Sequence, residues 1–175
     1  MSASITGARR NAFITAAVIF VIDQVVKWLV DGPLGLRQIG DTLELLPIFE
    51  LKRVHNYGVS LGMMQADTDT ARWLLVAMTA IIASGVAWWM LKERNRQDLL
   101  ALSLVLGGAF GNIVDRVRLG YVLDYANLHF GDWSPFLIFN VADAGITIGV
   151  LILLLRALLV REKPKQPVPQ ETSDA

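Results

Sequence analysis

The sequence predicts an α-helical polytopic membrane protein with four transmembrane helices. Hydrophobic residues make up 54% of the 175 residues, and the mean hydropathy is +0.47. A soluble domain of this length is less apolar, and each helix that crosses a bilayer needs about 20 apolar residues. We therefore expect a single membrane domain over residues 1–162, with spans at approximately 12–30, 73–91, 99–115 and 136–155.

The first span follows two basic residues, Arg9 and Arg10. Its apolar run is similar to that of a secretory signal peptide. However, Asp23-Gln-Val-Val-Lys27 comes next, in place of a small-residue cleavage site. We therefore expect this span to stay in the mature protein as a membrane anchor.

Residues 31–70 are too polar to cross a membrane. Within them, residues 43–64 carry short apolar clusters and β-branched residues, which predicts a few short strands lying on the bilayer. Asp67-Thr-Asp-Thr70 is typical of a helix N-terminus. The second span follows, and it has tryptophans near both ends, as interfacial residues of a membrane helix do.

The third span ends at Asp115 and Arg116, and residues 117–135 form a second extramembrane segment. The fourth span begins at Phe136 and carries two polar residues, Asn140 and Asp143. At 1.5 Å per residue, Asp143 is expected about 10 Å along this helix.

Basic residues indicate the orientation, because they cluster at the N-terminus, in 92–96 and in 161–165. The positive-inside rule then places both termini and the middle loop in the cytoplasm. The polar, proline-containing residues 163–175 are predicted to be a disordered cytoplasmic tail. With this topology, the unusual polar residues of the spans and of the outer segments converge on the outer leaflet.

Two of these residues, Asp124 and Asp143, are candidates for an aspartic protease dyad. Ionisable groups in a membrane are costly and usually mark a site or a structural pair. Two adjacent carboxyl groups do not easily ionise together, so one keeps a proton while the other acts as a base. The ionised acid activates a water molecule and the protonated acid polarises the carbonyl that is attacked. The pair titrates as a unit, so neither acid is assigned a fixed state.

Other polar residues in the spans have two interpretations. Asp23 and Lys27 are four residues apart on one helix face, which favours a structural ion pair over a proton relay. Asn112, Asp115 and Arg116 also share a face. Arg116 either pairs with Asp115 or reaches toward a lipid headgroup or a peptide carbonyl.

Small residues repeat at four-residue spacing in the third and fourth spans. The pairs are Gly107 with Gly111, and Gly145 with Gly149. This pattern lets helices approach closely, and we expect it to bring the fourth span against the third.

Several kinds of site are excluded by context. The net charge is zero, so nucleic acid is not an expected partner. There is no cysteine, and His55 and His129 lack the spacing of metal ligands, so we expect no metal. Residues 58–62 match the G-x-S-x-G nucleophile elbow, but the chain has no room for the large sheet that this elbow needs. No Walker loop or GxGxxG motif occurs.

Five motifs together resemble the lipoprotein signal peptidases, also called signal peptidase II. They occur in the order found in that family and extend from the first span to the fourth. The motifs are Asp23-Gln-x-x-Lys27, Asn56-x-Gly58, Gly107-Gly-Ala-x-Gly-Asn-x-x-Asp-Arg116, Val122-x-Asp124 and Phe139-Asn-x-Ala-Asp143.

The resemblance implies four transmembrane helices with a small periplasmic β-cradle and a short periplasmic helix, both built from residues 31–70. It also implies an aspartic endopeptidase of the bacterial inner membrane, acting near the periplasmic face. The substrates would be prolipoproteins whose cysteine carries diacylglycerol, cut just before that cysteine. Membrane lipids would be the other partners. The family implies no cofactor and sensitivity to globomycin, and we expect a monomer.

The same resemblance assigns roles to individual residues. Asp124 and Asp143 match the catalytic pair. Three residues, Asp23, Lys27 and Asp115, match supporting positions. The positions that line the substrate pocket are Asn56, Gly108, Asn112, Arg116, Asn140 and Ala142.

The chain departs from the family in two places. Val59-Ser60-Leu61 follows Gly58 where many members have Ala-Ala-Phe, and Tyr125-Ala-Asn127 follows Asp124 where an aromatic-aliphatic run is common. These changes bear on the packing of the cradle and on substrate preference. Two rival functions use the same acids, a proton-coupled transporter and a non-catalytic membrane scaffold. Against a transporter, the acids gather at one face, and the second span carries none.

Overall fold

The computed structural model describes residues 2–58, 69–131 and 133–159. Four helices and three strands occur in these residues, and the helices are long and apolar enough to cross a membrane. The fold class predicted from the sequence is therefore confirmed. In chain order the elements are α1 Ser2–Asp31, β1 Thr42–Leu46, β2 Phe49–Asn56, α2 Asp69–Lys92, α3 Arg96–Leu119, β3 Val122–Leu128 and α4 Val141–Leu159.

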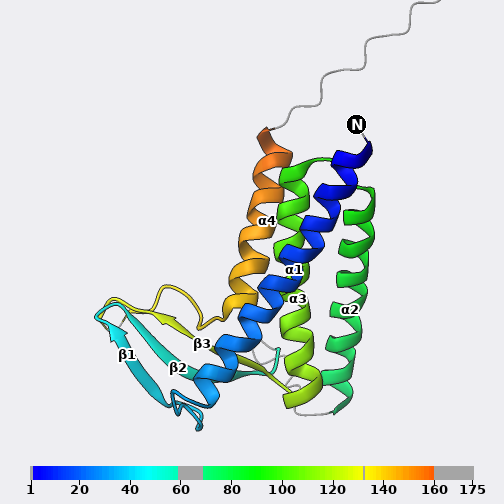
Figure 1. Ribbon diagram of the computed structural model, residues 1–175. Helices are drawn as coiled ribbons and strands as arrows, with labels where there is room; N and C mark the ends of the chain where they lie inside the picture. The colour runs from blue at the N-terminus through cyan, green and yellow to red at the C-terminus, as the bar shows by residue number, and fades with distance from the viewer. Residues whose placement is uncertain (1, 59–68, 132, 160–175) are drawn as a thin grey trace, which may run out of the picture.

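The helices form a bundle in which α3 packs against each of the other three. The start of α1 and the end of α4 lie at one end of the bundle, and the sheet lies at the other (Figure 1). Large apolar side chains such as Ile81 and Leu158 project outward and are exposed. An outward-facing apolar surface of this extent suits helices that are surrounded by lipid.

Glycines on α3 allow close contact with two different helices. A Cβ at Gly107 would lie 2.5 Å from the carbonyl oxygen of Ala16 in α1. A Cβ at Gly108 would lie 2.3 Å from the carbonyl oxygen of Ala142 in α4. Gly107 therefore meets α1, whereas Gly108 meets α4. The predicted packing of the fourth span against the third is confirmed, since Gly149 also packs on the backbone of Ala101 in α3.

The three strands form one antiparallel sheet in the order β1-β2-β3. An apolar cluster joins this sheet to the end of α1 and includes Val30, Leu51 and Tyr125. The sheet confirms the strands predicted within residues 43–64 as far as Asn56, and residues 59–64 lie outside the described part. The described residues 32–58 contain no helix. The short helix that the resemblance implies is therefore not found there, and residues 59–68 lie outside the described residues.

Helix α4 begins at Val141 and not at the predicted 136. The backbone of Phe139 pairs instead with β3, where its N–H donates to Ala126 at 3.1 Å and its carbonyl accepts from Ala126 at 2.7 Å. Asn140 then caps the helix, because its side-chain oxygen accepts from the backbone N–H of Asp143 at 2.9 Å. The Asp143 carboxylate in turn accepts from the backbone N–H of Asn140 at 3.3 Å, which completes a capping box. Asp143 therefore lies in the first turn of α4.

The other helices are longer than the predicted spans. Helix α1 already begins at Ser2 and α2 begins at Asp69, within the predicted helix start Asp67-Thr-Asp-Thr70. The first two residues of that motif lie outside the described residues. Helix α3 extends from Arg96 to Leu119, because Asn95 caps its start and Gly120, at a φ of 88°, ends it in the left-handed conformation. The predicted disordered tail, 163–175, also lies outside the described residues.

Candidate functional site

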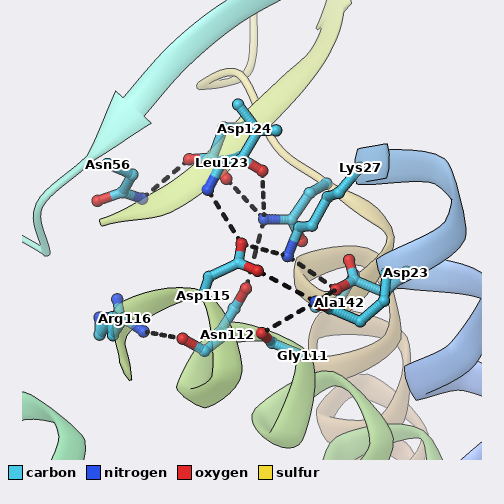
Figure 2. A network of polar contacts seen from close by, with 12 residues as sticks. Asp23, Lys27, Asn56, Gly111, Asn112, Asp115, Arg116, Leu123, Asp124 and Ala142 are labelled. Carbon is cyan, nitrogen blue, oxygen red and sulfur yellow. Dashed lines mark hydrogen bonds and ion pairs between the residues drawn. The ribbon is translucent and has the colours of Figure 1, made fainter. Parts of the chain in front are cut away.

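Two carboxyl groups, Asp124 on β3 and Asp143 on α4, lie together where the sheet meets the helix bundle. Asp124 is 2% exposed, whereas Asp143 is half-buried. Amide side chains donate to both: Asn56 Nδ2 to Asp124 Oδ2 at 3.0 Å, and Asn112 Nδ2 to Asp143 Oδ1 at 2.8 Å. Figure 2 shows Asn56 and Asp124 on neighbouring strands, above the end of α3.

Asn140 connects the two acids. Its side-chain nitrogen donates to Asp124 Oδ1 at 2.6 Å, while its side-chain oxygen and its backbone N–H form the capping box with Asp143. Burial raises the pKa of the Asp124 carboxyl to about 7, and the nearby negative charge of Asp143 is the second cause. The hydrogen bonds from Asn56 and Asn140 oppose this rise in pKa. The structure thus brings together the two acids that the sequence singled out.

A buried ion triad lies beneath these acids. Lys27 Nζ is 2.8 Å from Asp23 Oδ2 and 2.8 Å from Asp115 Oδ2, and all three side chains are buried (Figure 2). Gln24 also donates to both carboxylates, at 3.1 Å each. The predicted ion pair between Asp23 and Lys27 is confirmed, and it joins α1 to α3 through Asp115.

The two outer members of this triad also hold the backbone beside each candidate acid. Asp23 Oδ1 accepts from the N–H of Ala142 at 3.0 Å, and Asp115 Oδ2 accepts from the N–H of Leu123 at 3.1 Å (Figure 2). Ala142 directly precedes Asp143, and Leu123 directly precedes Asp124. The triad therefore sets the positions of α4 and β3 next to the residues that carry the two carboxyl groups.

Arg116 lies beside this network (Figure 2) and forms no ion pair in the described residues. Asp115 pairs with Lys27 instead, and the Nε of Arg116 is buried without a hydrogen-bond partner among the described residues. Its Nη1 makes only a long contact of 3.4 Å with the carbonyl oxygen of Asn112. Of the two interpretations of Arg116, the structure favours the one in which the guanidinium is available to another group.

Gly108 and Ala142 were also predicted to line a pocket. Both are buried where α3 meets α4, and the carbonyl of Ala142 covers the position of a Cβ on Gly108. In this structure they are helix contacts, and their role toward a substrate stays a prediction.

A second polar cluster, which sequence reasoning missed, lies on β2. The buried Arg53 side chain forms an ion pair with Asp31 and donates to His55 Nε2 at 3.1 Å and to the Tyr121 hydroxyl at 3.2 Å. The His55 and Tyr121 rings stack with centroids 3.6 Å apart. Burial lowers the pKa of His55, and the charge of Arg53 lowers it further. The signal was the Arg-x-His spacing, since residues two apart in a strand share a face. This cluster holds the strand that carries Asn56.

No group of three or more His, Cys, Asp or Glu side chains in the described residues could hold a metal ion. The candidate site consists of two carboxyl groups, the amides that bond to them and Arg116, which has no ion pair within residues 2–58, 69–131 and 133–159. Together with four spanning helices and a small sheet, this arrangement defines a class of small helical membrane proteins that carry a pair of acids at one end of the bundle.

Comparison with known proteins places the chain in a family. The family model for signal peptidase (SPase) II matches residues 15–159, so the chain belongs to the signal peptidase II family. It is 57% identical over 167 residues to the lipoprotein signal peptidase of Rhizorhabdus wittichii, and 55% identical over 166 residues to that of Sphingopyxis alaskensis. Each alignment covers 95% of both chains. The resemblance seen in the sequence is confirmed.

The fold is also similar to solved structures of bacterial membrane enzymes. One matches with a TM-score of 0.74 at 27% identity, covering 89% of this chain and 93% of that chain. A second matches with a TM-score of 0.72 at 29% identity, covering 85% and 92%. These matches agree with a multi-pass bacterial membrane protein.

Proposed function

We propose that the protein is an aspartic endopeptidase that removes the signal peptide from diacylglyceryl-modified prolipoproteins, cutting before the lipidated cysteine. Its curated relatives carry the name lipoprotein signal peptidase, which supports the substrate class. The observation that carries the mechanism is the pair Asp124 and Asp143, which Asn140 joins by hydrogen bonds to both. The pKa of Asp124, raised to about 7, lets this pair hold one proton near neutral pH.

The chemistry then follows from one proton shared by the pair. The ionised carboxylate takes a proton from a water molecule as its oxygen attacks the carbonyl carbon of the scissile peptide bond. The protonated carboxyl group donates to the carbonyl oxygen, which becomes the oxygen of a tetrahedral intermediate. Return of a proton to the amide nitrogen allows the C–N bond to break. The macroscopic pKa values belong to the pair, so the mechanism assigns the resting proton to neither acid.

Arg116 supplies the part of the site that neither acid provides. Its buried Nε–H lacks a partner in the described residues. An unsatisfied buried donor costs free energy, and donating to an acceptor on a ligand removes that cost. A backbone carbonyl of the substrate is such a ligand, and binding it would align the peptide across the two acids. Asn56, Asn112 and Asn140 hold the carboxyl groups in place.

The orientation of the chain completes the proposal. With both termini in the cytoplasm, the sheet end of the bundle faces the periplasm, because the described termini and the sheet lie at opposite ends (Figure 1). The lipid-anchored cysteine of the substrate also lies at the outer surface of the inner membrane, which is the depth at which this orientation places Asp124 and Asp143. Globomycin is then expected to inhibit cleavage.

The test is cleavage of a purified diacylglyceryl prolipoprotein in detergent by wild type, Asp124→Asn and Asp143→Asn. We expect product from wild type alone, with both variants folded by circular dichroism and thermal unfolding. Asp98→Asn is a control, because it changes an acid at the opposite end of α3 that pairs with Arg156. Cleavage at the wild-type rate by either site variant would disprove the dyad. An inactive wild type would disprove the enzymatic function and favour a transporter or scaffold.

A further inference from the structure

An apolar groove opens beside α4 and ends at Asp143. It encloses about 500 Å³ between side chains that precede α4 and side chains on the first turns of α4. The first group is Pro135, Phe136, Leu137 and Phe139, and the second is Asp143, Ala144, Thr147 and Ile148. Leu128, at the end of β3, closes it near the sheet. The residues before α4 form one wall. Because α4 begins only at Val141, residues 135–139 run toward β3, where Phe139 pairs with Ala126.

The groove offers almost no hydrogen-bonding groups to an occupant. Among its lining side chains only Asp143 and Thr147 are polar, and the remainder are apolar groups such as Phe136, Phe139 and Ile148. An extended peptide in this groove would bring backbone N–H and C=O groups that find few partners, which costs free energy. An alkyl chain makes no such demand. The lining therefore favours an alkyl chain over a peptide segment.

The outer rim of the groove faces the surroundings of the bundle. Phe136 is 61% exposed and Ile148 is 51% exposed. Ile148 lies on α4, and an exposed apolar side chain on a spanning helix faces the lipid, so an occupant can enter from the bilayer without crossing water.

We propose that this groove holds one acyl chain of the diacylglyceryl cysteine, next to the reacting peptide bond. The inference rests on the proposed function, in which the cut directly precedes that cysteine. The lipid is then attached one residue from the carbonyl that Asp143 helps to attack, and the groove begins at Asp143. From Asp143 to Ile148 the helix rises about 7.5 Å, so the groove holds the first part of the chain and the bilayer holds the remainder.

The groove acts on orientation more than on affinity. Lipid tails are as apolar as leucine side chains, so an acyl chain gains little by leaving the bilayer for the groove. Holding the chain does place the cysteine, and a misplacement of about 1 Å at a reacting bond costs up to roughly 100-fold in rate. We therefore expect the groove to affect kcat for substrates whose chains are long enough to occupy it.

The first experiment fills the groove with Thr147→Phe and compares two substrates, one with palmitoyl chains and one with acetyl groups on the glycerol. Leu154→Phe is the matched control, because Leu154 is 53% exposed and lies seven residues further along the same face of α4, outside the groove. We expect Thr147→Phe to lower kcat for the palmitoyl substrate about tenfold, with at most about a twofold change for the acetyl substrate. We expect Leu154→Phe to change neither.

Two outcomes would overturn the inference. Equal losses on both substrates would mean that the groove holds peptide or that the variant distorts the site, and no loss on either would mean that the groove is not used. A wild-type protein that cleaves neither substrate would instead overturn the proposed function.

A second measurement does not depend on how Thr147→Phe folds. A substrate whose acyl chain carries a diazirine near the glycerol is bound to the Asp124→Asn variant, irradiated and mapped by mass spectrometry. We expect labels in residues 135–139 and 143–148, lost on adding unlabelled lipidated peptide but not on adding the same concentration of phosphatidylglycerol. Labels confined to other helices, or equal competition by phosphatidylglycerol, would overturn the acyl site.

Discussion

Lys27→Met tests how far the candidate site depends on the buried ion triad. The substitution keeps an unbranched side chain of similar length but removes the only cation between Asp23 and Asp115 in the described residues. Both carboxylates still accept hydrogen bonds from the N–H groups of Ala142 and Leu123. Without Lys27, the Asp23 and Asp115 carboxylates are two buried negative charges with no cation between them.

The expected loss of stability is large. Removing one partner of a buried ion pair costs about 3–5 kcal/mol, because a buried charge is left uncompensated. A natural domain is stable by about 5–15 kcal/mol, so a folded fraction remains for measurement.

Activity provides a second and independent readout. The charge of Lys27 is one of the causes that lower the Asp124 pKa, while burial and Asp143 raise it. Removing that charge lets the Asp124 pKa rise above about 7, so the pH–rate profile moves to higher pH. A side chain that only packs helices together would reduce the folded fraction without moving the profile.

The assay measures unfolding by a denaturing detergent in mixed micelles, and kcat between pH 5 and pH 9. Arg156→Met is the matched control, because it breaks a 2.5 Å ion pair with Asp98 that also joins two helices but lies at the other end of the bundle. We expect this control to lose about 1 kcal/mol or less, since its partners are partly exposed, and to keep the wild-type profile. A Lys27→Met protein as stable as this control, with an unmoved profile, would refute the role given to the triad.

Three further predictions concern the acids and the helix contacts. Because the pKa of Asp124 rises from 3.8 to about 7, the folded state keeps a proton that the unfolded state releases, and wild-type stability falls as pH rises between these values. Asp124→Asn should therefore match wild type at pH 4 and exceed it by up to about 4 kcal/mol at pH 8 in detergent unfolding; an equal pH slope in both would contradict this. Asn56→Ala removes a hydrogen bond that lowers the Asp124 pKa, so its pH–rate profile should move to higher pH, and a move to lower pH would contradict the geometry. Gly108→Ala places a Cβ 2.3 Å from the Ala142 carbonyl and should cost about 1–3 kcal/mol, whereas Gly85→Ala in α2 meets nothing within 4 Å and should cost nothing; equal unfolding midpoints would contradict the close contact.

The spans and the acids were predictable because their signals are local. Long apolar runs have few alternatives, and Asp23 with Lys27 at four-residue spacing already indicates a pair. Asp115 could not be added to that pair from the sequence, because it comes from another helix and its distance depends on the packing of α1 against α3. The same holds for the backbone bonds to Leu123 and Ala142, which no side-chain pattern reports.

The start of α4 shows a different limit. Residues 136–140 read FLIFN, an apolar run that continues the hydropathy of the span. Their backbone nevertheless pairs with β3 at Phe139, and this tertiary pairing outweighs the local preference. As a result, the predicted position of Asp143, about 10 Å along a helix that begins at Phe136, was wrong, because Asp143 lies in the first turn of α4. The groove beside α4 could not be expected either. Arg53 was missed for a related reason, since the Arg-x-His spacing places two side chains on one face of a strand but does not report that the charge will be buried.

The contact between Asp23 and Ala142 joins residues 119 positions apart, one in the first helix and one in the last. At about 5–20 residues per second, the ribosome makes these two residues roughly 6–24 s apart. During that interval the contact between Asp23 and Lys27 is available within α1 itself, so each buried charge already has a neighbour of opposite sign. The acid pair beyond them is completed only when α4 docks. A newly made chain therefore acquires the full site last, after the helices that surround it are in the membrane.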